Sequence, residues 1–179
     1  NKNNIYDKHK LIHTLISLGK YEDAELRLNK LIKKKSITGE QLGLTFFYMA
    51  SVKYEKNDLS SALSYGLKAH RLLKDKPELN YLIYLVCLRL NKIEEAKNFI
   101  LISINTNKRI LDKNNSFNSE NILDQVDLYL RAINLYINLN NVSEAYKMIE
   151  ELSEFLSNKM DKKIIFSIFE DLLIKYSLS

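Results

Sequence analysis

The sequence predicts an all-α protein, organised as a solenoid of about four helix-turn-helix repeats, and three observations support this fold class. The 179-residue chain holds only four glycines and one proline, which leaves little material for the tight turns of a β-sandwich or barrel. One six-residue pattern recurs four times, flanked by apolar residues at helical spacing. The length and an apolar content of 46% fit a single domain with a buried core.

The recurring pattern consists of Gly or Asn, any residue, an apolar residue, two further residues and Ala. The four alanines lie 38, 34 and 49 residues apart, and periods of roughly 20–50 residues are typical of solenoid arrays. Gly or Asn tolerates the left-handed backbone that closes a helix, and Ala lets the next helix approach closely. The pattern therefore predicts a helix-turn-helix at each copy. The copies span residues 19–24, 57–62, 91–96 and 140–145.

The first two predicted helix pairs span 6–18 with 21–34 and 40–56 with 59–74. In the first pair the apolar stripe runs through Leu11, Leu15 and Leu18, then Leu28, Leu31 and Ile32. In the second pair, Thr38 and Gln41 have the spacing of a capping box that opens the first helix.

The third and fourth predicted pairs span 77–90 with 93–106 and 121–139 with 142–157. Pro77 suits a first helical turn, where no amide hydrogen is needed. Asn91 with Glu94, and Asn141 with Glu144, have capping-box spacing. The polar, Asn-rich stretch 107–119 is interpreted as a loop insertion, which accounts for the 49-residue gap. A single apolar helix is expected at 161–177.

These features resemble the tetratricopeptide-repeat (TPR) family over residues 6–157. The second copy is most similar, with small and aromatic residues in the family's positions at Phe46, Ala50, Tyr54, Ala62 and Ala69. The resemblance implies a right-handed superhelix whose last helix, 161–177, caps the final repeat. Several small-residue positions depart from the family pattern, so a related helical-hairpin solenoid remains an alternative. The departing residues are Ile12, Leu31, Tyr84, Ser103, Ile133 and Leu152.

Catalytic and metal-binding motifs are not evident in the sequence. His9 and His13 share a helical face, but no Glu accompanies them in the zincin pattern and no third ligand is nearby, so we expect exposed helix residues. Cys87 lies in the apolar run 81–90 and is expected to be a buried, inert thiol. Four scattered glycines cannot build a phosphate-binding loop. We therefore expect no enzyme activity, no cofactor and no metal.

The resemblance implies that the first helix of each pair lines a concave groove that binds a partner peptide or helix. Aromatic and aliphatic side chains dominate the corresponding positions. A Lys/Asn/Arg clamp for a terminal carboxylate, found in chaperone-tail members of the family, is missing from them. The groove positions are His9, His13, Ile16, Phe47, Ser51, Tyr54, Tyr81, Leu85, Leu88, Arg89, Leu130, Asn134, Ile137 and Asn138.

The function expected from this groove is a scaffold or adaptor that holds a protein partner and takes no small-molecule substrate. In such a groove, Arg89, Asn134 and Asn138 would orient the partner. The alternative is a structural subunit that acts by oligomerisation. The chain carries a net charge of +9 over residues 1–113 and −4 over 114–179, an asymmetry suited to head-to-tail packing.

RNA binding through lysine-rich faces is a third, weaker alternative, because no basic run is interleaved with stacking aromatics. The run Lys33, Lys34 and Lys35 is interpreted as a solvated helix end. No membrane span is expected, since the longest apolar run has about half the ~20 residues required. The first residue is Asn1 and not Met, from which we expect a trimmed or processed N-terminus. This favours an exported or periplasmic protein over a cytoplasmic one.

Overall fold

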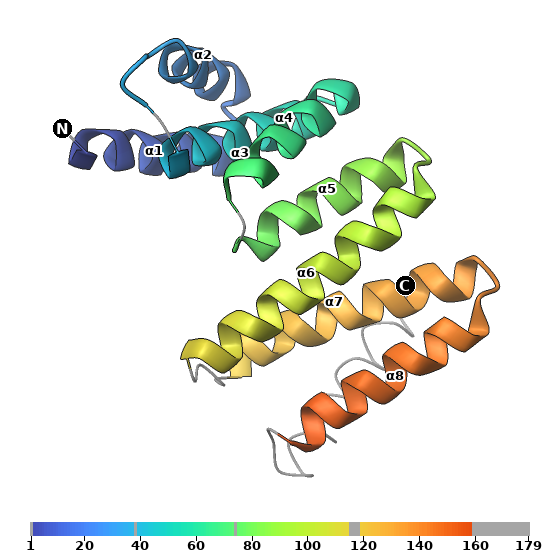
Figure 1. The fold of residues 1–179 in the computed structure, drawn as a ribbon. Helices are drawn as coiled ribbons and strands as arrows, with labels where there is room; N and C mark the ends of the chain where they lie inside the picture. Colours follow the sequence, from blue (N-terminus) through green and yellow to red (C-terminus); the bar gives the residue numbers. More distant parts are fainter. Residues whose placement is uncertain (1, 38, 74, 115–118, 159–179) are drawn as a thin grey trace. The chain divides into compact units, whose positions relative to one another are not determined.

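The computed structural model describes residues 2–37, 39–73, 75–114 and 119–158, and over these residues it is helical with no strand. The all-α repeat fold is confirmed, while the right-handed superhelical course stays a prediction. The expected helix 161–177 and the Thr38 capping box lie outside the described residues. The helices are α1 (Lys2–Ser17), α2 (Tyr21–Ile32), α3 (Gly39–Glu55), α4 (Leu59–Leu72), α5 (Pro77–Arg89), α6 (Ile93–Asn114), α7 (Ser119–Asn138) and α8 (Val142–Ser157) (Figure 1).

The chain divides into two compact units, Asn1–Thr106 and Asn107–Ser179, and the boundary falls within α6; the single domain expected from the sequence stays a prediction. In the first unit α3 packs against α1, α2, α4 and α5. In the second unit α7 packs against α8. Each unit is described by itself below.

The four predicted turns share one backbone geometry. The first residue of each copy has a positive φ: Gly19 at 70°, Asn57 at 62°, Asn91 at 55° and Asn140 at 53°. In every copy its amide donates to the carbonyl three residues earlier, and the next amide donates to the carbonyl five residues earlier, at 2.8–3.0 Å. This is the Schellman pattern that satisfies the last carbonyls of a helix. The apolar residue of each copy then begins α2, α4, α6 or α8.

The helix caps confirm one predicted capping position and correct another. Asn141 caps α8 by accepting a hydrogen bond from the Glu144 amide at 3.3 Å, and Pro77 begins α5 as expected. Asn91, however, is the left-handed residue that closes α5, so it is not the N-cap of α6. An N-cap lies one residue later, at Lys92, because α6 begins at Ile93.

The predicted loop 107–119 is wrong over residues 107–114, which continue α6. The apolar stripe of α6 extends past Ile104 to the buried Leu111, so helical burial persists through the polar stretch. Asn107 donates from its Nδ2 to Oε1 of Gln125 on α7 at 2.8 Å, and the Gln125 side chain is fully buried. The polar side chain of Asn107 therefore forms a hydrogen bond with a buried group. Composition alone does not distinguish such a helix from a solvated loop.

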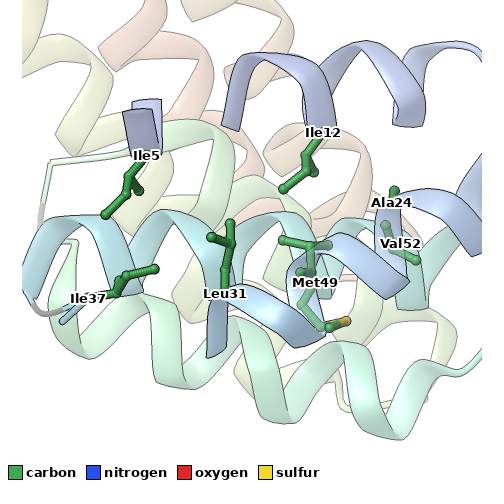
Figure 2. Close-up of a cluster of buried hydrophobic side chains, with 8 residues drawn as sticks. Ile5, Ile12, Ala24, Leu31, Ile37, Met49 and Val52 are labelled. Atoms are coloured by element: carbon green, nitrogen blue, oxygen red, sulfur yellow. The ribbon is translucent and has the colours of Figure 1, made fainter. Parts of the chain in front are cut away.

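The core of the first unit begins with a cluster shared by α1, α2 and α3. Figure 2 shows Ile5 and Ile12 of α1 facing Leu31 and Met49 from the other two helices. The predicted stripe on the first helix is partly wrong, since Leu11 and Leu18 are 44% and 64% exposed. The buried face of α1 instead carries Ile5, His9 and Ile12.

Small residues lie where helices of the repeats approach one another, as the pattern predicts. The four motif alanines are all buried. Ala62 shares a second core cluster with Ala50, Leu82 and Val86. Gly66, one turn further along α4, lies so close to α5 that an added Cβ would stand 2.9 Å from Ile83 Cγ1.

The second unit buries apolar side chains of α7 and α8, among them Val126, Tyr129, Ala145 and Leu152. Burial raises the pKa of Tyr129 to about 12, with a smaller contribution from the Glu151 and Glu154 carboxylates. The Tyr129 phenol is therefore a neutral core group.

Candidate partner-binding surface

The predicted groove residues of the first unit lie on α1, α3 and α5. His9 is buried and Ile16 is half-buried. The other eight are exposed or half-buried, and two of them, Phe47 and Tyr54, pack against the core cluster around Ala62. Contacts of α3 with both α1 and α5 bring these three helices together. These eight residues are His13 on α1, Phe47, Ser51 and Tyr54 on α3, and Tyr81, Leu85, Leu88 and Arg89 on α5.

Aromatic rings form a continuous series from α1 to α3. The ring of His13 meets the edge of Tyr48 at 6.1 Å between centroids, and Tyr48 in turn contacts Phe47 at 5.4 Å. Tyr48 is half-buried, and its burial raises the pKa of the phenol, with a further contribution from Glu78. Tyr48 was not among the predicted groove residues, although the run of three aromatic residues at 46–48 could have indicated an aromatic surface.

Cationic side chains cover two of the aromatic rings. Lys76 Nζ lies 5.7 Å from the centroid of Phe47, and the Arg89 guanidinium carbon lies 4.9 Å from that of Tyr54. Both distances are within the range of cation–π attraction. Arg89 Nη2 also donates to Asn57 Oδ1 at 2.6 Å, so the turn residue orients the guanidinium across the tyrosine ring.

The remaining polar and aromatic positions have local partners. Ser51 Oγ donates to the Phe47 carbonyl oxygen at 3.1 Å, one helical turn earlier. Tyr81 packs its ring 5.7 Å from that of Tyr84. Because the Ser51 hydroxyl is bound to a carbonyl of its own helix, the exposed area that α3 contributes here is mainly aromatic.

His9 is a correction to the predicted groove, because its side chain is only 3% exposed. Its Nε2 lies 2.9 Å from Thr45 Oγ1 on α3. The Thr45 hydroxyl donates its own hydrogen to the Gln41 carbonyl at 2.8 Å, so it must accept from His9. Nε2 therefore carries the proton, and Nδ1 is a buried acceptor that finds no hydrogen-bond partner among the described residues. Burial lowers the pKa of His9 below its usual 6.5.

The fourth predicted set lies on α7 in the second unit. Asn134, Asn138 and Ile137 are exposed, and Leu130 is half-buried. The residues are accessible within their own unit. Their alignment with the surface on α1, α3 and α5 remains a prediction.

Other chemistry is sparse in the described part of the chain. No group of three His, Cys, Asp or Glu side chains in the described ranges is arranged to hold a metal ion. Cys87 is buried as expected, and burial raises the pKa of its thiol. None of the described helices combines the length and the apolar character needed to cross a bilayer.

Comparisons with known proteins leave the family of this chain open. No family model and no curated protein matches the sequence. Among solved structures, the fold is similar to one titled MamA AMB-1, with a TM-score of 0.47 and 11% identity. That similarity covers 93% of this chain and 98% of the other. At this identity and TM-score, nothing about function is inferred from it.

Proposed function

We propose that this protein is a non-enzymatic interaction scaffold that binds a partner peptide or helix on the surface formed by α1, α3 and α5. The observation that carries the proposal is the position of the aromatic residues. Phe47, Tyr54 and Tyr81 are half-buried on neighbouring helices: Phe47 and Tyr54 pack against the core cluster around Ala62, and each of the three keeps part of its side chain exposed. Partly exposed aromatic side chains are enriched where proteins bind one another.

The contacts within this surface favour a partner that is mainly apolar. Arg89 and Lys76, the two cations named on this surface, each lie over an aromatic ring, so a partner would meet the rings together with these charges. Burying these rings would contribute binding free energy in proportion to the apolar area, and Arg89 would orient the partner. Asn134 and Asn138 on α7 would extend the binding surface.

A site-specific cross-link in the full chain tests this proposal. A photoreactive phenylalanine analogue replaces Tyr81 in one variant and the exposed Ser64 of α4 in the other. We expect the Tyr81 variant to capture a distinct partner band in cells, and the Ser64 variant to lack it. Equal capture at both positions, or at neither, would contradict a binding surface on α1, α3 and α5.

Self-assembly is the second candidate function, and an apolar stripe on α8 favours it. Val142, Tyr146 and Ile149 are 56%, 64% and 45% exposed, and they follow one another at helical spacing. A second copy of this chain would bury that stripe. Solution mass separates the two functions, because a monomer at all concentrations favours the scaffold and a stable oligomer favours assembly.

A further inference from the structure

A small cavity lies between α1 and α2, and none of the residues of the proposed binding surface lines it. It has a volume of about 160 Å³. Leu11, Ile12 and Leu31 supply its apolar lining, and the last two belong to the core cluster in Figure 2. A dry apolar cavity of about 150 Å³ holds a benzene ring. The space therefore suits one phenyl or branched aliphatic side chain.

Four basic side chains complete the lining of this cavity. Arg27, Lys30 and Lys34 follow one another along α2 and just beyond it, and Lys8 faces them from α1. Among the described residues none of the four forms an ion pair. By contrast, Glu25 of α2 is bound to Lys53 of α3 and to Lys56 just beyond the end of α3.

A solvated helix end does not account for this arrangement. Lys34 lies at the C-terminal end of α2, where cations are favoured by the helix dipole. Arg27 lies in the middle of that helix and Lys8 lies on another, so neither benefits from the dipole. Four like charges around one hollow repel one another even when exposed, and a bound anion would relieve this repulsion.

We propose that this cavity binds an acidic peptide segment of another protein, which inserts one large apolar side chain between flanking carboxylates. The apolar lining recognises the inserted side chain, and Lys8, Arg27, Lys30 and Lys34 pair with the carboxylates. RNA is disfavoured as the occupant, because no aromatic side chain lines the cavity for a base to stack on. The site is independent of the surface on α1, α3 and α5.

The probe is a synthetic nine-residue peptide with one central Phe and four Glu on each side, titrated into the full chain. We expect saturable binding that shifts the methyl resonances of Leu11, Ile12 and Leu31. Replacing the central Phe by Ala should weaken binding about tenfold, the lower end of what burying such a side chain contributes. Replacing every Glu by Gln should weaken it by at least as much, and the Glu peptide should bind less tightly as salt rises.

Variants of the protein locate the binding. Lys30→Glu should weaken peptide binding about tenfold, and Lys30→Gln should weaken it less. Lys35→Glu changes charge equally on an exposed residue that does not line the cavity, and it should have no more than a twofold effect. Circular dichroism checks that each variant remains helical.

Three outcomes would overturn the proposal. Equal binding of the Phe and Ala peptides would show non-specific charge attraction with no use of the cavity. Equal loss in Lys30→Glu and Lys35→Glu would place the peptide elsewhere. Tighter binding of a single-stranded RNA or of anionic phospholipid vesicles, with the same dependence on Lys30, would assign the basic residues to another class of partner.

Discussion

His9 on α1 donates its Nε2 proton to the Thr45 hydroxyl on α3 across 2.9 Å, in a site where both side chains are buried. The threonine can accept because its own hydrogen is directed to the Gln41 carbonyl. This pair joins the first helix of one repeat to the first helix of the next. His9, which was predicted to line the groove, is therefore a structural residue.

Removing the acceptor should leave the His9 donor buried and unpaired. We expect Thr45→Val to lower the free energy of unfolding by about 1–3 kcal/mol, measured by urea denaturation. Thr14→Val on α1 is the control, since Thr14 is exposed and bonds only to a carbonyl of its own helix. A loss no larger than that of the control would contradict the assigned hydrogen bond.

Acid should destabilise the fold through His9. Because the pKa of His9 is lowered by burial, the unfolded chain binds the proton near pH 6.5 and the folded chain does not. The free energy of unfolding should therefore be constant above about pH 7 and fall below it, by no more than about 1.4 kcal/mol per pH unit from this group. His9→Leu should show a flatter profile between pH 7 and 5. Parallel profiles for the two proteins would exclude His9 as the cause.

Stability should depend on which residue occupies the first motif position, because its backbone is left-handed. Asn91 has a φ of 55°, and its side chain forms no hydrogen bond with another described residue, whereas Asn57 is bound by Arg89. We expect Asn91→Ala to cost about 1 kcal/mol, and Asn91→Gly to be neutral or stabilising. Asn98→Ala is the control, because Asn98 lies within α6 and alanine is favoured there. Thermal melts of the three variants make the comparison.

Ala62 should not tolerate a larger side chain. Its Cβ is buried in the cluster with Ala50, Leu82 and Val86, where α3, α4 and α5 meet. Ala62→Phe would overpack this contact at a cost of about 1–3 kcal/mol. Ser60→Phe on the exposed side of α4 gives the matched comparison. If both variants melt at the same temperature, the repeat register at α4 is wrong.

Glu25 should contribute to stability through Lys53 of α3 and Lys56 just beyond the end of that helix. It lies 2.7 Å from Lys53 and 2.8 Å from Lys56, and hydrogen bonds from these lysines lower the pKa of its carboxyl. The contribution is therefore present at neutral pH and is lost as pH falls through the lowered pKa. We expect Glu25→Gln to cost about 0.5–1 kcal/mol at low salt and less in 1 M salt, by denaturant titration. Glu22→Gln, which alters a far more exposed residue, should cost less.

The helix-turn-helix units follow from local sequence alone. Each turn depends on consecutive residues: a left-handed Gly or Asn, an apolar residue that begins the next helix, and a small Ala at the fourth position of that helix. Backbone conformation and hydrogen bonding at a helix end are local properties, so a repeated local pattern was enough to predict them. The same reasoning located the four turns at residues 19–24, 57–62, 91–96 and 140–145.

Which faces of the helices are buried depends on how the helices pack against one another. In α1, apolar residues occur on two faces, and contact with α2 and α3 selected Ile5, His9 and Ile12 over Leu11 and Leu18. The extension of α6 depended likewise on Gln125, a buried partner in another helix. The buried face of α1 and the length of α6 depend on residues distant in sequence, because a helix face is buried only where another helix packs against it. Periodicity in a single helix cannot supply that information.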